Sequence, residues 1–289
     1  MKIDKSTRFL IVGLGLLGGS YAKALKKQGY TVEAVTRSQS TIDYALEQGI
    51  IDGGAAFPDP DIIGRADFVV LAMYPKTLLE WVADNQRYFK PGALITDVTG
   101  VKTCVVDPVQ AILRQDVEFI AAHPMAGRET LGIRNADETI FRGANYIVTP
   151  TDKNTPEAIG ACEELGRILG FARISRLSPE KHDQMIGFVS QLTHAIAVAL
   201  MTCNDIEDLE KYTGDSFRDL TRIAKINDEM WSELFLANRE ALLEQMDQFS
   251  AQLLKLRQQL ADGDREAMRQ VMRHSTARRK ALEKQDERK

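Results

Sequence analysis

The chain has 289 residues, of which 44% are hydrophobic and 27% charged, and its formal net charge is −4. This length suffices for one or two domains with full hydrophobic cores, and the acidic balance gives no basic surface, so we expect no nucleic-acid partner. Three scattered cysteines exclude a disulfide framework and a zinc site, and they suit a reducing compartment. The first strand begins by residue 8 with no room for a signal peptide, and no apolar run approaches the ~20 residues of a membrane span. We therefore expect a cytoplasmic protein without membrane contact.

The first elements in the chain are a strand, a glycine-rich turn and a helix. Four apolar residues, Phe9 to Val12, run into the turn GLGLLG, and a helical pattern follows. In a dinucleotide site Gly13 would allow the tight turn, Gly15 the approach of a pyrophosphate, and Gly18 close packing of helix and strand. The first N–H groups of the helix would face the phosphates, and its first residues are Leu16 and Leu17. A tight turn that binds nothing is the alternative.

The end of the second predicted strand, residues 31–36, bears on the choice of cofactor. NAD-type sites place an Asp or Glu here to bind the ribose hydroxyl, whereas this chain has Thr36, Arg37 and Ser38. An arginine flanked by hydroxyls suits a 2′-phosphate, which a guanidinium binds in a bidentate manner. We therefore expect NADP as the cofactor, with NAD possible. The alternative is a solvated loop arginine.

Further buried strands are predicted over residues 67–73, 93–97, 118–122 and 145–149, and a covering helix over residues 155–170. Tyr74, Thr99 and His123 follow the first three of these strands. Because ligands in open α/β sheets lie beyond the carboxyl ends of the strands, these side chains point at one crevice. The pattern predicts the α/β class, with an N-terminal Rossmann-type dinucleotide-binding domain over residues 1–174.

From Ser178 onwards the sequence has only helical periodicity, which predicts an all-α domain over residues 175–289 for substrate binding and dimerisation. Residues 185–201 are nearly all apolar or small, so we expect this helix to be buried on most sides. Its polar stripe consists of Gly187, Ser190, Gln191 and His194. A long amphipathic helix is predicted from residue 228 to about 260, with Gly263 as its breaker. Either the second subunit of a homodimer or the same subunit covers these apolar faces.

Candidate chemistry lies in a few polar side chains. His123 has an unperturbed pKa near 6.5 and stands at the crevice, so it can take a proton from a substrate hydroxyl as hydride leaves the carbon. A histidine fixed in a proline turn is the alternative. His194 is as consistent with a packed residue as with a ligand group, and we interpret His182 and His274 as surface residues. Arg222 lies in an apolar stretch, which predicts a buried or half-buried cation that needs a carboxylate from the protein or from a substrate.

Five segments together resemble the prephenate/arogenate dehydrogenase family of tyrosine biosynthesis, in order and over most of residues 8–260. They are GLGLLGGSYAKALKKQG, ALITDVTGVK, HPMAGRETLG, FVSQLTHAIAVAL and FRDLTRIAKINDEMW. The resemblance implies a hydride transfer from a ring carbinol to NAD(P), with loss of the ring carboxylate as CO₂. It further implies that His123 is the base, that Arg222 binds the side-chain carboxylate, and that His194 lines the same pocket.

The chain departs from the family pattern at three positions that would contact the substrate. Gly100 stands where a serine commonly supports the histidine, which leaves Thr99 or a water as its partner. Gln191 replaces the first histidine of a frequent SHxxH pair. Arg128 follows HPMAG where a small polar residue is usual, and this added cation favours the dianionic prephenate over arogenate.

Two other functions remain open at this point. A β-hydroxyacid-type dehydrogenase would need a lysine in the first long helix of the second domain, and residues 185–201 contain none. A non-catalytic NADPH-binding sensor would have no use for His123 and Arg222.

Overall fold

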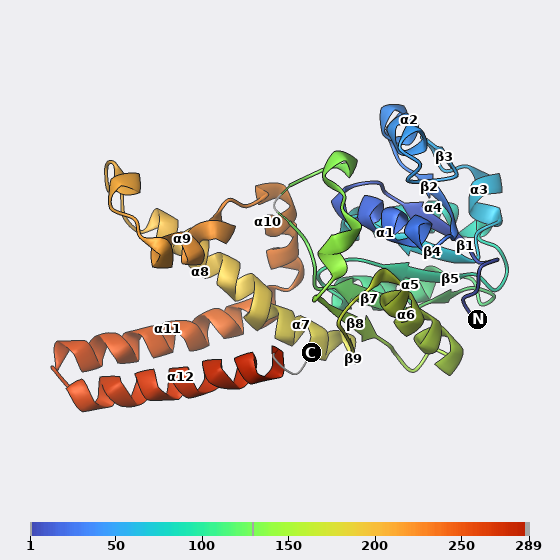
Figure 1. The fold of residues 1–289 in the computed structure, drawn as a ribbon. Helices are drawn as coiled ribbons and strands as arrows, with labels where there is room; N and C mark the ends of the chain where they lie inside the picture. Colours follow the sequence, from blue (N-terminus) through green and yellow to red (C-terminus); the bar gives the residue numbers. More distant parts are fainter. Residues whose placement is uncertain (1, 129, 287–289) are drawn as a thin grey trace. The chain divides into compact units, whose positions relative to one another are not determined.

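The main feature of the fold is a parallel sheet with the strand order β3-β2-β1-β4-β5-β6 (Figure 1). The computed structural model describes residues 2–128 and 130–286. All neighbouring strands of this sheet pair in parallel. The strands are β1 (Arg8–Val12), β2 (Thr31–Val35), β3 (Gly53–Ala55), β4 (Phe68–Leu71), β5 (Leu94–Asp97) and β6 (Glu118–Phe119). This is the order of the Rossmann fold, so the predicted fold class is confirmed.

Helices cover both faces of the main sheet because its strands are apolar on both sides. Phe9 and Ile11 of β1 join one buried cluster, whereas Leu10 and Val12 join another. The first cluster lies under α1, α2 and α6, and the second lies under α3, α4 and α5. The bounds are α1 (Leu16–Lys27), α2 (Gln39–Glu47), α3 (Pro60–Gly64), α4 (Pro75–Asn85), α5 (Thr103–Ile112) and α6 (Pro156–Leu169).

A second, three-stranded sheet corrects the prediction of one strand over residues 118–122. The chain pairs with β5 only through β6, and β7 (Ala121–Pro124) then pairs antiparallel with β8 (Asn145–Thr149). The reason lies at Asp97, whose carboxylate accepts the N–H of Ala122 at 3.1 Å and so replaces a strand partner. His123 therefore lies within this smaller sheet. The third strand of the sheet is β9 (Arg173–Arg176), which pairs parallel to β8 and was not predicted from the sequence.

The helical part begins with α7 (Pro179–Ile186), a π-helical turn (Gly187–Gln191) and α8 (Leu192–Thr202), which form one continuous run. By length and composition alone this helical run of 24 residues is long and apolar enough to span a membrane. The expectation that no apolar run approaches the length of a membrane span was therefore wrong. One copy of the chain does not bury this run on most sides, because it leaves several of the apolar side chains exposed. They are Met185, Phe188, Val189 and Met201. The cytoplasmic location stays a prediction.

The predicted long helix from residue 228 is interrupted at Asn238. After α9 (Asp215–Thr221) and a 3₁₀ turn (Arg222–Ala224), α10 spans Asp228–Ala237 and α11 spans Arg239–Ala261. The interruption occurs because the Asn238 side chain turns into the protein, where its amide donates to the Asp183 carbonyl at 2.9 Å and to Gln191 Oε1 at 2.7 Å.

The chain divides into two compact units, one up to Asn238 and the other from Arg239 onwards. The second unit contains α11 and α12 (Arg265–Asp286), which contact each other as a helical hairpin. Gly263 permits the reversal with φ of +67°, a backbone conformation that L side chains rarely adopt. The predicted domain division after residue 174 stays a prediction.

Candidate active site

The turn between β1 and α1 has the geometry of a phosphate-binding loop. Gly13 has φ of +96°, and a Cβ there would lie 2.4 Å from the Ala72 carbonyl oxygen. A Cβ at Gly18 would lie 1.9 Å from the Gly13 oxygen, so helix and strand pack too closely for any side chain. By contrast, a Cβ at Gly15 would have no neighbour within 4 Å, which leaves room for a ligand against the backbone. The first N–H groups of α1, from Leu16 onwards, face this space.

The end of β2 carries hydroxyls and a guanidinium beside this turn. Arg37 is exposed, whereas Thr36 and Ser38 are half-buried. The Ser38 hydroxyl caps α2 by accepting the Thr41 N–H at 3.3 Å. Glu33, the acidic residue within β2, is buried and binds Arg8 and Arg65, so it belongs to an internal ion-pair cluster.

A buried ion pair connects β5 to β7 directly beside His123. Asp97 and Lys102 are both fully buried, and Lys102 Nζ lies 2.6 Å from Asp97 Oδ2. The same ammonium donates to the Ala122 carbonyl at 2.6 Å and lies 3.3 Å from Thr99 Oγ1. The Thr99 hydroxyl in turn bonds to Asp97 and to the Val101 carbonyl, so it is occupied within the protein. This cluster fixes the backbone of β7 one residue before His123.

His123 contacts a second histidine that continues to a carboxylate. Its Nδ1 lies 2.8 Å from Nε2 of His182, and His182 Nδ1 lies 2.7 Å from Asp183 Oδ1. Asp183 also accepts the backbone N–H groups of Lys102 and Thr103, both at 2.8 Å, and the Thr103 hydroxyl at 2.6 Å. The start of α7 is thereby held against the start of α5. The partner of His123, left open between Thr99 and a water, is His182.

Burial and neighbouring charges keep both histidines neutral. Burial lowers the pKa of His123 well below 6.5, and the adjacent His182 and Lys102 lower it further. Burial lowers the pKa of His182 also, although the bond to Asp183 opposes this shift. Burial raises the pKa of Asp183, but its bonds from His182 and from Thr103 and Lys102 outweigh that effect and leave the pKa below its usual value. At neutral pH the site therefore combines a carboxylate with two uncharged imidazoles.

The expectation that His182 lies at the surface was wrong, since it is fully buried. That expectation was made because no motif supports a role for His182 in the sequence, but contact with α5 and β7 decides its environment. A signal was present in the sequence: Pro179, His182, Asp183 and Ile186 recur at i, i+3, i+4 and i+7 and form the buried face of α7. A His-Asp pair on an inward-facing stripe is a candidate for polar contacts with another element.

Helix α10 lies over the ends of β4 and β5. Glu233 accepts the Lys76 backbone N–H at the start of α4 at 3.1 Å, and Leu234 lies next to Gly100. A Cβ at Gly100 would be 3.7 Å from Leu234 and 3.9 Å from His123 Cε1, which are ordinary van der Waals distances. Gly100 therefore stands beside His123 as predicted. Tyr74, the residue before α4, is 40% exposed at the same end of the sheet.

Two residues of the polar stripe differ in environment. His194 stacks on Trp231 with ring centroids 3.8 Å apart, and its Nδ1–H donates to the Ser190 carbonyl at 2.9 Å. Gln191 is 1% exposed and donates to the Leu234 carbonyl at 2.9 Å, while its oxygen accepts from Asn238. Gln191 therefore binds α10 to the π-helical turn. A contact between Gln191 and the substrate stays a prediction.

The two candidate arginines are both exposed in one copy of the chain. Arg222 begins the 3₁₀ turn after α9, and its side chain is exposed in one copy, which corrects the expectation of a buried or half-buried cation. Arg128 pairs with Asp137 at 2.7 Å, and Asp137 has its pKa lowered to about 2 by hydrogen bonds from Thr139 and by Arg128. The charge of Arg128 is thus already shared with a protein carboxylate.

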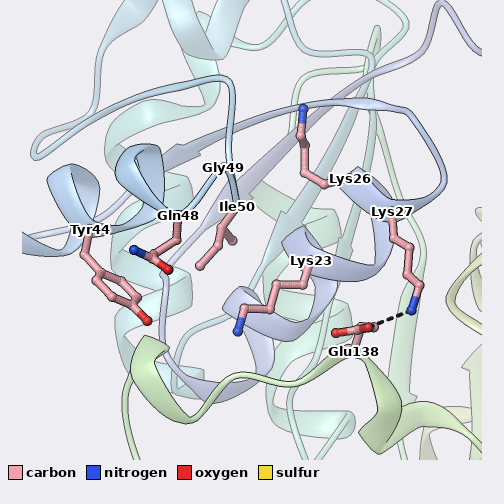
Figure 2. Close-up of a pocket in the computed structure, with 8 residues that line it drawn as sticks. All are labelled: Lys23, Lys26, Lys27, Tyr44, Gln48, Gly49, Ile50 and Glu138. Atoms are coloured by element: carbon pink, nitrogen blue, oxygen red, sulfur yellow. Dashed lines mark hydrogen bonds and ion pairs between the residues drawn. The ribbon is translucent and has the colours of Figure 1, made fainter.

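A cavity of about 430 Å³ beside the later turns of α1 is separate from this site (Figure 2). It is lined by Lys23, Lys26, Lys27, Tyr44, Gln48, Gly49, Ile50 and Glu138. The three ammonium groups bind the Ala136 carbonyl, Asp52 and Glu138 at 2.6, 2.5 and 2.8 Å. The cavity therefore contains satisfied charges and none of the predicted site residues.

Family models and curated relatives agree on the kind of protein that this chain resembles. Residues 21–170 match the prephenate dehydrogenase nucleotide-binding domain, and residues 178–274 match the prephenate dehydrogenase dimerization domain. A prephenate dehydrogenase of Bacillus subtilis is 31% identical over 89% of this chain and 71% of the relative. A cyclohexadienyl dehydrogenase of Zymomonas mobilis is 30% identical over 94% of both chains.

Solved structures give the same result. The prephenate dehydrogenase of A. aeolicus, crystallised with hydroxyphenyl propionate and NAD⁺, has a TM-score of 0.89 and 30% identity over 97% of this chain and all of that chain. A 3-hydroxyisobutyrate dehydrogenase of Salmonella typhimurium has a TM-score of 0.55 at 12% identity, which is a likeness of fold alone.

Proposed function

We propose that this chain, which belongs to the prephenate dehydrogenase family, oxidises and decarboxylates prephenate to 4-hydroxyphenylpyruvate. The observation that carries the proposal is His123, an uncharged imidazole that His182 fixes in the smaller sheet, one residue beyond the Ala122 N–H that the Asp97 carboxylate of β5 accepts. A dehydrogenase of this kind needs one base at the carbinol, and His123 has the required protonation state. The alternatives of a β-hydroxyacid-type enzyme or a sensor leave the His123, His182 and Asp183 contacts without a purpose.

In the proposed reaction the protein accepts one proton, that of the substrate hydroxyl. When bound, the nicotinamide dinucleotide supplies the acceptor for the hydride of the ring carbinol. His123 takes the hydroxyl proton as the carbonyl forms, and the bond from the ring to its carboxylate then breaks to release CO₂. The electron pair of that bond enters the ring and yields a phenol oxygen, which recovers the proton. Arg222 and His194 are proposed to hold the substrate, with Arg222 on its side-chain carboxylate.

For the cofactor we infer a preference for NADP over NAD. The end of β2 offers Thr36, Arg37 and Ser38, and an exposed guanidinium between two hydroxyls suits a 2′-phosphate. Gly13, Gly15 and Gly18 form the pyrophosphate site with Leu16 and Leu17, and Tyr74 and Thr99 stand near the nicotinamide end. NAD remains usable because no part of this arrangement repels a ribose hydroxyl.

Arogenate is the second candidate substrate. The Arg128–Asp137 ion pair supports it. A guanidinium that is already bound to a protein carboxylate attracts the second negative charge of prephenate less, so it favours prephenate over arogenate less strongly. The test is to follow reduced nicotinamide formation with prephenate and with arogenate, each with NADP and with NAD. Turnover of prephenate with NADP supports the proposal, and turnover of neither substrate by folded protein refutes it.

We also infer a homodimer formed through the helical part. The apolar side chains left exposed along Pro179–Thr202 need a cover, and the matched family domain is described as a dimerization domain. Light scattering at micromolar concentration is expected to give twice the mass of 32.3 kDa. A monomer at all concentrations would contradict this inference.

A further inference from the structure

We infer that Asp183, acting through His182, holds His123 in the tautomer with the proton on Nδ1 and an unshared electron pair on Nε2. In that tautomer Nε2 can take a proton and Nδ1 cannot. Asp183 and His182 are thus positioning residues for His123. The inference rests on the proposed function only for its consequence in catalysis, since the tautomer is a property of the protein itself.

The carboxylate of Asp183 accepts hydrogen bonds from donors whose positions the backbone fixes. Oδ1 of Asp183 accepts the N–H of Lys102, and Oδ2 accepts the N–H of Thr103, both at 2.8 Å. The Thr103 hydroxyl adds a third bond at 2.6 Å. These donors at the start of α5 stabilise the ionised carboxylate, which can only accept hydrogen bonds. The contact of 2.7 Å from His182 Nδ1 to Asp183 Oδ1 therefore requires that Nδ1 carries the proton.

The proton on His182 Nδ1 decides what the next nitrogen can do. A neutral imidazole has one N–H and one unshared pair, so Nε2 of His182 must be an acceptor. The only hydrogen bond consistent with its 2.8 Å contact to His123 Nδ1 is one in which His123 donates. The opposite tautomer of His123 would bring two unshared pairs together between a half-buried and a buried ring. Geometry at Asp183 is thus transmitted to the far nitrogen of His123 across two rings.

The arrangement also suits the protonated state of the base. When Nε2 of His123 gains a proton, Nδ1 keeps its bond to His182, and no hydrogen bond must be rebuilt. Two sets of charged groups lie beside the hydrogen-bonded series His123–His182–Asp183. They are the Asp183 carboxylate itself, on the far side of His182, and the buried Lys102–Asp97 pair. A fixed carboxylate at the end of the chain stabilises the new imidazolium, as a carboxylate does in an acid–base triad.

The test reads the tautomer directly in the full-length protein. The four histidines are His123, His182, His194 and His274, so labelling with ¹⁵N-histidine gives few signals, and His123→Asn and His182→Phe assign two of them. Long-range proton–nitrogen spectra at pH 8 are expected to show a protonated Nδ1 and an unprotonated Nε2 for His123. A proton on Nε2 of His123 in the wild type overturns the inference, whatever the substrate proves to be.

Variants separate positioning from mere packing. His182→Gln keeps an oxygen that accepts from His123, whereas His182→Phe removes the acceptor and frees the tautomer. We expect His182→Phe to move the proton to Nε2 of His123 and to lower kcat about 10- to 100-fold, part of the ~10²–10⁴ due to general base catalysis. We expect His182→Gln to keep the Nδ1–H signal and most of kcat, with dinucleotide affinity unchanged in both. His274→Gln, on the exposed face of α12, is the matched control and should change neither.

A folded His182→Phe protein that retains the Nδ1–H signal and full kcat would refute the role of His182. Should that variant not fold, the wild-type spectrum alone decides. If prephenate is not turned over but the predicted tautomer is found, the proposed function fails and the inference stands.

Discussion

Replacing Lys102 by methionine should destabilise the protein strongly. The methionine keeps most of the length and apolar volume of the lysine but removes the charge that neutralises Asp97. Both side chains are fully buried, and the ammonium bonds to Asp97 and to the Ala122 carbonyl at 2.6 Å each. After the substitution Asp97 keeps its bonds from Thr99 and from the N–H of Ala122, but its charge has no counterion.

The expected loss follows from the stranded charge. Breaking a buried pair by removing one partner costs about 3–5 kcal/mol of unfolding free energy, a large part of the ~5–15 kcal/mol typical of a folded domain. In the double variant Asp97→Asn/Lys102→Met no buried charge remains unpaired. We expect it to be more stable than Lys102→Met alone by roughly 2 kcal/mol or more, since the penalty of the unpaired carboxylate disappears.

Urea unfolding followed by circular dichroism measures these differences. The matched control is Lys90→Met, because Lys90 and Asp67 lie 2.5 Å apart, much as the buried pair does, but the two side chains are 47% and 25% exposed. An exposed pair contributes at most about 1 kcal/mol, so this control should change little. If Lys102→Met lost no more stability than Lys90→Met, burial would not distinguish the two pairs and the reasoning would be wrong.

His123→Asn should lower kcat by ~10²–10⁴ and leave dinucleotide affinity intact, as steady-state kinetics and titration can measure. Because burial lowers the pKa of His123, the acid limb of kcat/KM should lie below pH 6.5, and a limb above that value would contradict the burial. The folded protein then binds fewer protons than the unfolded chain, so unfolding free energy should fall as the pH drops through 6.5. Arg37→Ala should raise KM for NADP about 10-fold or more with little change for NAD, and Thr36→Asp should invert the preference. Arg222→Ala should cost about 2–4 kcal/mol in kcat/KM, whereas an unchanged KM would exclude it from substrate binding.

Sequence patterns predicted the parts of the fold that local rules determine. The glycine turn, the strand before it, the helix after it and the covering helix over residues 155–170 follow from spacing and residue type, and in the structure Thr155 caps that helix by accepting the Ala158 N–H. The division of residues 118–124 into two sheets could not be predicted this way. It depends on the Asp97 carboxylate, which lies 25 residues away along the chain from the N–H that it accepts.

The same limit applied to the site. His123 was predicted because it follows a strand in a fold whose ligands bind there. His182 was not, because its burial arises from α5 and β7, two elements that precede it by about 60 to 80 residues. The exposure of Arg222 was not predicted either, since apolar neighbours in the sequence do not show whether a side chain is covered within one copy of the chain.

The start of α7, which orients His123, is linked by hydrogen bonds to α10, which packs over Gly100. The orientation of His123 and the packing of α10 therefore cannot change independently. Asp183 binds α5 through its carboxylate and Asn238 through its carbonyl. Asn238 binds Gln191 in the π-helical turn, and Gln191 binds the Leu234 carbonyl of α10. Leu234 stands against Gly100, within ordinary contact distance of the place where a serine side chain would begin beside His123. A change at Asn238 should therefore affect both the packing over Gly100 and the orientation of His123, although its side chain contacts neither.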